Sequence, residues 1–210
     1  MMKSVLMTAW TAKTTFLWGC LCCLCGLFTS CSEESDEVEE YANWRERNEA
    51  FFASLEDSLS RDAANWLKIK NYSLDATTAG KPADYIYAKV IERGEGTESP
   101  MYTDSVRVSY LGRLLPSASY AEGYEFDGTV YGKYSSQTNS TTKFVLSALT
   151  DGFATAVQHM HRGDYWRIYV PSELAYGAYG TTGIPGYSVL TFDLTLIDFC
   201  SPGTPMNPYN

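Results

Sequence analysis

The chain has 210 residues, with 16 lysines and arginines against 25 aspartates and glutamates, and a net charge of −9. Proteins that bind nucleic acid concentrate positive charge on one surface, and no basic cluster occurs here, so the composition argues against DNA or RNA as a partner. Hydrophobic residues make up 45% and charged residues 20% of the chain. These proportions are typical of a globular protein with one substantial core and exclude a disordered or fibrous chain.

Residues 1–30 have the pattern of an export signal. Two lysines and no acidic residue accompany an apolar stretch over residues 16–28. A charged start followed by a short apolar run is typical of a signal peptide, and the run is too short for a stable membrane span. The sequence Leu-Phe-Thr-Ser-Cys at 27–31 resembles a bacterial lipobox, which implies lipidation of Cys31. The alternative is an ordinary signal peptide with an incidental cysteine.

Residues 31–40 form an acidic segment immediately after this cysteine. Such a charge run indicates a solvated, disordered spacer between an anchor and a folded domain. It also resembles the acidic signal that directs some Gram-negative lipoproteins to the cell surface. We therefore expect a lipid-anchored protein of a bacterial cell envelope, at the outer membrane and facing either the periplasm or the outside.

The six cysteines indicate neither a metal site nor a disulfide framework. Five of them lie between Cys20 and Cys31, and only Cys200 lies elsewhere. A zinc site needs a second group of ligands at a distance, which is missing. After removal of residues 1–30 only Cys31 and Cys200 remain, so no structural disulfide is expected.

Residues 41–62 have the periodicity of an amphipathic helix. The apolar side chains on one stripe are Tyr41, Trp44, Phe51, Phe52, Leu55 and Leu59. Such a stripe predicts a helix that docks on its own domain or pairs with a second copy to form a homodimer; the third alternative is a helix that forms only marginally. The turn residues at 77–82 then predict the end of a helical extension and linker that covers residues 41–82.

Beyond residue 82 the apolar period changes from helical to alternating. The segments that place apolar side chains on one face are 85–91, 105–110, 165–170 and 190–196. Only one helix is indicated among them, with Phe153, Val157 and Met160 one or two turns apart, Thr150 or Asp151 as its cap and Gly163 beyond its end. We predict an α+β domain over residues 83–200, in which an antiparallel half-barrel sheet wraps one short helix. Residues 201–210 are expected to form a flexible tail.

Several blocks of this domain resemble the FK506-binding protein (FKBP) family in order and spacing. The most specific runs from Ile168 to Gly177 and is similar to the family's I-P-x-x-L-A-Y-G pattern. The others are 108–114, 126–127, 143–146, 151–153, 162–164, 183–185 and 190–194. The resemblance implies an FKBP-like fold and a peptidyl-prolyl cis-trans isomerase (rotamase) that needs no cofactor or metal. It also implies proline-containing polypeptides as substrates and assistance to the folding of extracytoplasmic proteins.

Proline isomerisation requires a pocket rather than a nucleophile. Rotation about the X-Pro bond crosses a barrier of about 18–20 kcal/mol because it breaks amide resonance. An apolar pocket removes the water that stabilises the planar amide and holds the proline ring. The resemblance implies Tyr110, Phe126, Asp127, Phe153, Tyr176 and Phe192 as catalytic residues and Leu149, Thr150 and Ile184 as substrate-binding residues.

Two insertions lengthen the region between Tyr110 and Phe144, at 116–124 and 132–141. We expect them to reshape access to the pocket. A second function remains open from the sequence, in which the domain keeps the FKBP fold but serves as a catalytically weak binding or assembly module on the cell envelope.

Overall fold

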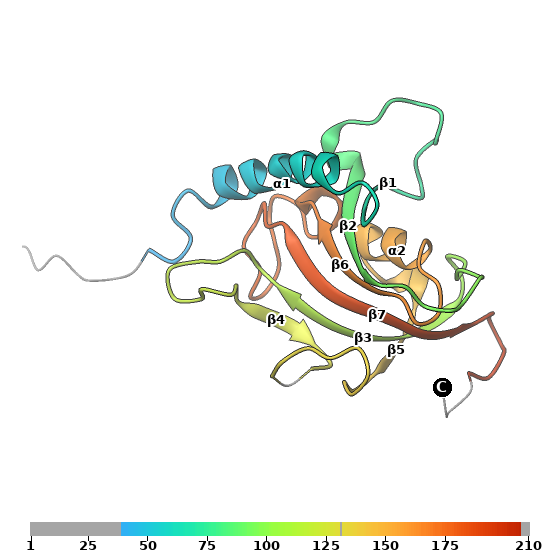
Figure 1. Ribbon diagram of the computed structural model, residues 1–210. Helices are drawn as coiled ribbons and strands as arrows, with labels where there is room; N and C mark the ends of the chain where they lie inside the picture. The colour runs from blue at the N-terminus through green and yellow to red at the C-terminus, as the bar shows by residue number, and fades with distance from the viewer. Residues whose placement is uncertain (1–38, 131, 207–210) are drawn as a thin grey trace, which may run out of the picture. The chain divides into compact units, whose positions relative to one another are not determined.

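One antiparallel sheet organises the computed structural model, which describes residues 39–130 and 132–206 (Figure 1). The strands are β1 Trp66–Lys70, β2 Tyr85–Glu92, β3 Ser105–Arg113, β4 Glu125–Gly128, β5 Thr142–Val145, β6 Tyr165–Val170 and β7 Leu190–Cys200. They are ordered β1-β2-β6-β7-β3-β4, and β5 also pairs with β3. The helices are α1 Trp44–Arg61 and α2 Asp151–Val157, with short 3-10 turns at Pro82–Asp84, Leu146–Ala148 and Ser172–Leu174. The predicted α+β class is confirmed.

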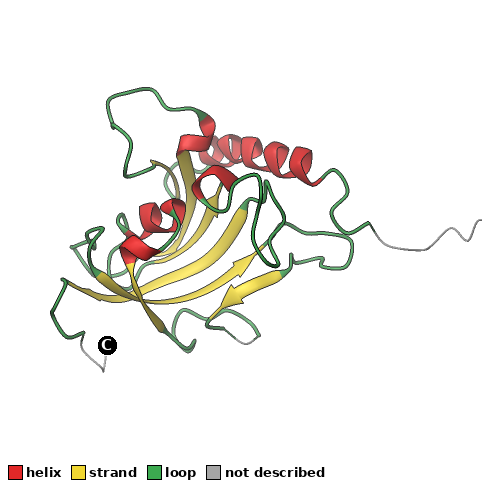
Figure 2. Ribbon diagram, turned by 180° about the vertical axis from the view of Figure 1, so that it is seen from behind, coloured by secondary structure: helices red, strands yellow, loops and turns green. Residues whose placement is uncertain are grey.

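The inner face of the sheet, which carries Val106, Val108 and Tyr110 on β3, forms the main core. These three side chains are buried together with Trp166, Ile168 and Val170 of β6 and Leu190, Phe192, Leu194 and Leu196 of β7. Helix α2 lies across this face (Figure 2). Strand β6 has the predicted bounds, because its strict alternation of apolar and polar residues matches a strand with one face in the core.

Helix α2 is shorter than its apolar period suggests. It ends at Val157, and the next residues close tighter turns in which His159 donates to the carbonyl of Ala156 and Met160 to that of Val157. Bonds of this kind satisfy the last carbonyl groups of a helix. Thr150 is the N-cap residue, although its side chain makes no capping hydrogen bond.

Helix α1 packs on the opposite, outer face of the sheet. Phe52 and Leu55 are buried in a cluster with Trp66, Tyr87 and Val189. At the same face Glu56 forms an ion pair with Lys68 and accepts a 2.8 Å hydrogen bond from the hydroxyl of Tyr87. The helix therefore docks on its own domain, one of the arrangements expected from its stripe.

Strand β1 differs from the expected helix-and-linker segment at 41–82. It pairs with β2 from Trp66 opposite Lys89 to Lys70 opposite Tyr85. Leu67 and Ile69 point to the inner face, and Trp66 and Lys68 to the outer face beneath α1. A strand of five residues is too short for its alternation to be recognised in the sequence. Lys68 also looks solvent-facing there, although in the structure it lies over the rings of Tyr85 and Tyr87.

The phenol of Tyr87 makes the folded state sensitive to alkaline pH. Burial, and then the hydrogen bond to Glu56, raises the pKa of Tyr87 to about 12, above the value of about 10 in an unfolded chain. Its contribution is complete below pH about 10 and is lost as the pH rises through about 12. In urea unfolding between pH 9 and 12, Tyr87→Phe should lose less stability than the wild type. The fully exposed Tyr179, changed to phenylalanine, should follow the wild type; equal slopes for both variants would contradict the assignment.

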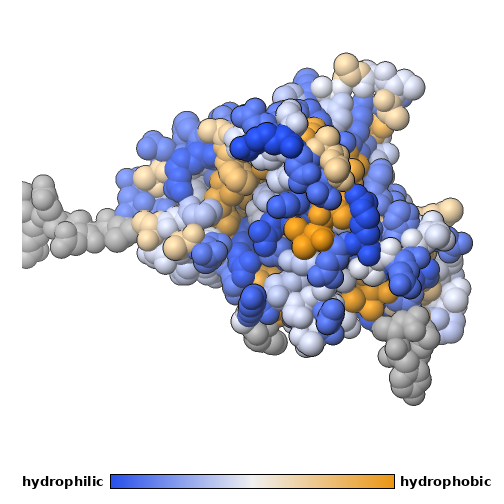
Figure 3. All heavy atoms as spheres, viewed as in Figure 1, coloured by the Kyte–Doolittle hydropathy of each residue, from blue (hydrophilic) through white to orange (hydrophobic). Residues whose placement is uncertain are grey.

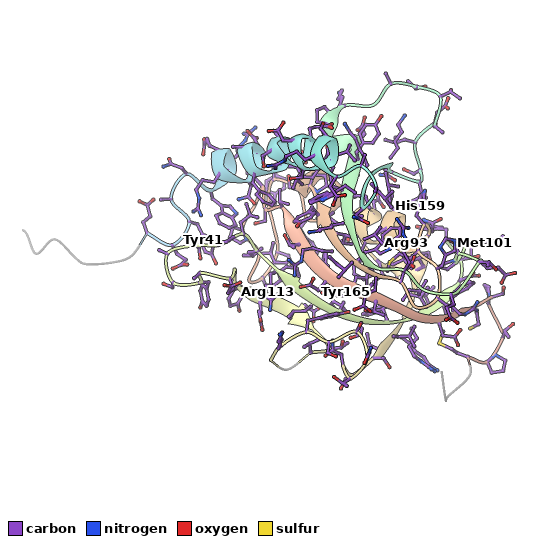
Figure 4. The ribbon with its side chains drawn as sticks, in the orientation of Figure 1. Tyr41, Arg93, Met101, Arg113, His159 and Tyr165 are labelled. Atoms are coloured by element: carbon purple, nitrogen blue, oxygen red, sulfur yellow. The ribbon has the colours of Figure 1, made fainter. Side chains whose placement is uncertain are left out.

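The middle of the outer face is polar and buried, whereas the sequence predicted only one buried face. Asp193 is 3% exposed. Its carboxylate accepts hydrogen bonds from Arg167 at 2.8 and 3.0 Å, from Arg113 at 3.4 Å and from the Tyr165 hydroxyl at 3.0 Å. Arg113 and Tyr165 are labelled over the sheet in Figure 4, and hydrophilic side chains cover most of this side in Figure 3.

The insertion at 132–141 contributes to this cover rather than to the inner face. The ring of Tyr134 stacks on that of Tyr165, with ring centroids 4.9 Å apart. Its hydroxyl donates to the carbonyl of Ser109 at 3.0 Å. The other insertion, 116–124, folds back onto the end of β3, where the backbone N–H of Leu114 donates to the carbonyl of Tyr124 at 3.0 Å.

Several expectations concern residues outside the described part of the chain. The predicted signal peptide, Cys31 and most of the acidic segment fall there, as do residues 207–210 of the tail. Within residues 39–130 and 132–206, no helix has the length and apolar character needed to cross a membrane. The same residues contain no group of three or more His, Cys, Asp or Glu side chains placed to hold a metal ion.

Candidate active site

A cavity of about 240 Å³ opens on the inner face of the sheet beside the start of α2. Its lining consists of Tyr110, Phe126, Asp127, Phe144, Ala148, Leu149, Thr150, Phe153, Tyr176 and Phe192. Pockets for small molecules usually measure about 300–1,000 Å³. The cavity therefore suits a single side chain with its adjoining peptide groups.

The aromatic rings of the pocket hold one another in edge-to-face contacts. The ring centroids of Phe192 and Phe153 are 5.2 Å apart, with an angle of 89° between the ring planes. Those of Phe192 and Phe126 are 5.5 Å apart, with an angle of 87°. Tyr110 contacts Phe153 at 6.0 Å and 82°. Such contacts contribute beyond the burial of apolar area and fix the ring planes. Phe153, in the first turn of α2, is 5% exposed and closes the floor of the cavity.

A β-bulge explains how two consecutive residues reach the same pocket. Along the β3–β4 pair Gly112 lies opposite Asp127 and Arg113 opposite Glu125, so Phe126 is the extra residue. An extra residue changes which face the neighbouring side chains point to. Phe126 and Asp127 consequently both line the cavity, while Glu125 pairs with Arg113 at 2.8 Å.

Gly112 provides the space for these rings. A Cβ atom at this position would lie 2.6 Å from the ring of Phe126 and 2.9 Å from that of Phe192. We expect Gly112→Ala to displace Phe126 and to lower stability by about 1–3 kcal/mol. If the pocket is catalytic, kcat/KM should fall about tenfold. Adding Phe126→Leu should restore stability but not the rate. A Gly112→Ala variant with wild-type stability and rate would contradict the packing argument.

Asp127 is held in a fixed orientation at the edge of the cavity. Its Oδ2 accepts a hydrogen bond from the hydroxyl of Tyr110 at 2.6 Å, and its Oδ1 accepts from the backbone N–H of Gly128 at 2.8 Å. Burial, and then Asp127, raises the pKa of Tyr110 far above its ordinary value. The hydroxyl proton of Tyr110 is directed to Asp127.

Tyr176 lies at the mouth of the pocket and is 42% exposed. Its hydroxyl is therefore within reach of a polypeptide that enters the cavity from solvent. Thr150, the N-cap residue of α2, also lines the cavity, as does Leu149, the residue before it. The rim thus combines one phenol with the polar start of a helix, which are the groups needed to bind peptide carbonyls.

The structure brings together all of the sequence-predicted pocket residues except Ile184. That residue is 6% exposed and belongs to the core cluster, and it exchanges backbone hydrogen bonds of 2.9 Å with Thr181 in a tight turn. Two lining residues were missed, Phe144 and Ala148. Phe144 could have been found, because it lies in the block 143–146 that resembles the family and alternates there with Lys143 and Val145; in the structure it pairs with Val106 of the inner face.

Fold and site together define a sheet-and-helix domain with an aromatic pocket, and the comparison with known families agrees. Residues 96–197 match the family described as FKBP-type peptidyl-prolyl cis-trans isomerase. The macrophage infectivity potentiator of Trypanosoma cruzi is 36% identical over 123 residues, which are 58% of this chain and 56% of that protein. The FKBP-type isomerase FkpA of Escherichia coli K12 is 34% identical over 110 residues, which are 52% and 36% of the two chains. The chain thus spans about half or less of the length of these relatives.

Solved structures show the same fold. A peptidyl-prolyl cis-trans isomerase from Pseudomonas syringae pv. tomato superposes with a TM-score of 0.54 at 24% identity, covering 76% of this chain and 96% of that one. FkpA from Escherichia coli superposes with a TM-score of 0.53 at 24% identity, covering 77% and 63%. These likenesses extend beyond residues 96–197 and agree with one sheet that includes the strands before them.

Proposed function

We propose that this protein is a peptidyl-prolyl cis-trans isomerase that acts on X-Pro bonds of extracytoplasmic polypeptides and assists their folding. The observation that carries the proposal is the aromatic cavity with the oriented carboxylate of Asp127 at its edge, within an FKBP-type domain. Proline is the residue that fits such a cavity best, since its ring is compact and apolar and it carries no N–H that would need a partner there.

The aromatic pocket lowers the barrier by replacing water. Phe153 forms the floor beneath the proline ring, and Tyr110, Phe126 and Phe192 form the walls. Water stabilises the planar amide through its polar carbonyl, and an apolar wall does not. The twisted amide has a less negative oxygen, so it loses less when water is removed, and this difference between the two states is what accelerates rotation.

The polar groups of the rim fix the polypeptide on either side of the rotating bond. The hydroxyl of Tyr176 donates to one substrate carbonyl and the backbone N–H of Thr150 to another, while Leu149 contacts the neighbouring side chain. Ile184 acts indirectly in this scheme, because its buried side chain anchors the loop that begins at Tyr176. One end of the substrate is held while the other rotates.

A protease-coupled assay on an X-Pro peptide tests the activity. The wild type should accelerate isomerisation well above the spontaneous rate, and Phe126→Ala should remove most of the acceleration. Wild-type rates no faster than those of this variant would refute the isomerase. Retained binding of a proline peptide in that case would favour the alternative, a binding or assembly module of the envelope.

The cell-envelope location rests on residues 1–40. The charged start, the short apolar run and the box ending at Cys31 support export and lipid anchoring. Radiolabelled palmitate should enter the wild type in a bacterial host and be absent from Cys31→Ala. Equal labelling of the two would refute the anchor at this cysteine.

Helix α1 serves its own domain in this proposal rather than a homodimer. Trp44, Phe52 and Leu55 are buried against the described domain, so a dimer through the same stripe would require the helix to leave it. Sedimentation at micromolar concentration of a chain that starts after the anchor should give the mass of a monomer. A dimer whose formation is abolished by a charge at Leu55 would contradict this arrangement.

A further inference from the structure

The loop between Tyr176 and the start of β7 connects the pocket to helix α1. We call residues 176–189 the pocket loop. Tyr176 at its first end lines the cavity, and Leu190 directly after it begins the strand that carries Phe192. The two ends of the loop are joined, because Tyr187 donates its backbone N–H to the carbonyl of Gly177 at 3.0 Å. A shift at the Tyr187 end is therefore passed on to the residue next to Tyr176.

Two residues of α1 bind the second end of the pocket loop through hydrogen bonds. The indole Nε1–H of Trp44 donates to the hydroxyl of Ser188 at 2.8 Å, and that hydroxyl donates to the carbonyl of Pro185 at 2.6 Å. The side-chain Oδ1 of Asn48 accepts the backbone N–H of Val189 at 2.8 Å. All of these contacts join residues more than 140 positions apart, except the one between Ser188 and Pro185.

These hydrogen bonds are buried, so the loss of either partner is costly to the structure. Trp44 is 7%, Asn48 1% and Ser188 3% exposed. A buried polar group that loses its partner costs more than an exposed one, because water does not replace the bond. Both polar atoms of the Asn48 side chain form hydrogen bonds, since its Nδ2 also donates to the carbonyl of Trp44 at 2.7 Å.

The amide of Asn48 interrupts an otherwise apolar contact surface. It occupies a buried position of α1 between Trp44 and Phe52, one turn from each. A helix that only needed to cover the sheet would carry an apolar residue there. The polar side chain instead matches one particular backbone N–H of the pocket loop. Arg45 adds a contact from the same turn, with its guanidinium 4.3 Å from the ring centroid of Tyr187.

We infer that Trp44 and Asn48 are positioning residues of the candidate active site, which hold the pocket loop so that Tyr176 is placed in advance at the mouth of the cavity. This inference rests on the proposed isomerase function. Both residues lie outside the family-matched segment 96–197, on a helix that would otherwise be a spacer. The site is then completed by a part of the chain that contributes no atom to its lining.

The test compares three variants that each remove a hydrogen bond between α1 and the pocket loop, Trp44→Phe, Asn48→Leu and Ser188→Ala, with Trp66→Phe as control. Trp66 lies at the outer face, where it stacks on Tyr169, and gives the control the same change of side chain. Steady-state kinetics are measured well below the melting temperature. We expect KM for an X-Pro peptide to rise about fivefold in the three variants, since one buried hydrogen bond is worth about 1 kcal/mol. The value of kcat should change less than twofold.

This split separates positioning from stability. A variant that is merely less stable lowers the folded fraction, which reduces the apparent kcat and leaves KM unchanged. Trp66→Phe should show that pattern or none. Because Trp44 and Ser188 share one hydrogen bond, the double variant should match Ser188→Ala, which also loses the bond to Pro185, rather than add the two effects. Unchanged KM in Trp44→Phe and Asn48→Leu would overturn the inference.

Amide hydrogen exchange gives a reading that does not depend on catalysis. The N–H groups of Tyr187 and Val189 should exchange about tenfold faster in Asn48→Leu than in the wild type, while β6 amides keep their protection. If the wild type binds a proline peptide without isomerising it, the proposed function fails, and the peptide Kd takes the place of KM. Unaltered exchange and unaltered Kd would then refute the role of α1 on their own.

Discussion

Replacing Asp127 with alanine is expected to lower kcat/KM for an X-Pro peptide about 100-fold, as the loss of one preorganised polar group does in other active sites. The carboxylate is fixed by the hydroxyl of Tyr110 at 2.6 Å and by the N–H of Gly128 at 2.8 Å, so it needs no reorganisation when a substrate enters. Its negative charge repels the carbonyl oxygen of a planar amide more than that of a twisted one. The barrier to rotation falls by that difference.

Two further variants separate the charge of Asp127 from its orientation, and a third serves as a control. Asp127→Asn keeps the shape without the charge and should lose about tenfold. Tyr110→Phe keeps the ring and releases the carboxylate, so a smaller loss is expected. Glu125→Gln removes a carboxylate of the same strand that contacts Arg113 away from the pocket, and it should keep the wild-type rate. An Asp127→Ala variant within twofold of the wild type would rule out an electrostatic role.

Replacing Asp193 with alanine is expected to cost about 3 kcal/mol of folding free energy and to lower the melting temperature by about 6–10 °C. This carboxylate is the common partner of Arg113, Arg167 and Tyr165 on the outer face. Its hydrogen bonds raise the pKa of the Arg167 guanidinium, and burial followed by Asp193 raises that of the Tyr165 phenol. Removal leaves a half-buried cluster with excess positive charge. The estimate is at the lower end for buried pairs because the Arg167 side chain is 41% exposed.

Urea and thermal unfolding measure the effect of Asp193 directly. Glu125→Ala removes the exposed partner of Arg113, with 51% of its side chain accessible, and should cost less than about 1 kcal/mol. A loss below 1 kcal/mol for Asp193→Ala would show that the arginines find other partners or water. The rate per folded molecule should remain close to the wild type, because Asp193 does not line the pocket.

The strands of the inner face could be predicted because their burial is strictly periodic. Tyr165–Val170 alternates without a break, and its bounds in the structure are the predicted ones. On β3 and β7, by contrast, both faces are buried. Arg107, Asp193 and Thr195 are polar and alternate with apolar residues, so the sequence pattern places them toward solvent, whereas the structure buries them. Asp193 is enclosed by Arg113, Tyr165 and Arg167, and Thr195 contacts Tyr134 of the inserted residues. Contacts over such sequence distances leave no local signal.

The site was predictable to the extent that its residues lie in recognisable blocks. Phe126 and Asp127 form such a pair, although only the bulge opposite Gly112 explains why both line the cavity. Ile184 lies in a matching block as well, but a tight turn with Thr181 places it in the core. Asn48 shows the opposite case. A single polar residue on a helix carries no motif, and its partner at Val189 is known only from the fold.

Strand β1 and the helix before it determine where the autonomous folding unit begins. A polypeptide cut at residue 83 would retain every pocket residue but would leave β2 as a bare sheet edge, since its N–H and C=O groups now pair with β1. Unpaired edges recruit other strands, and Tyr87 and Tyr169 would add newly exposed aromatic surface beside that edge. Such a fragment should aggregate during refolding. We therefore expect the residues that precede the family-matched segment to keep the domain from aggregating.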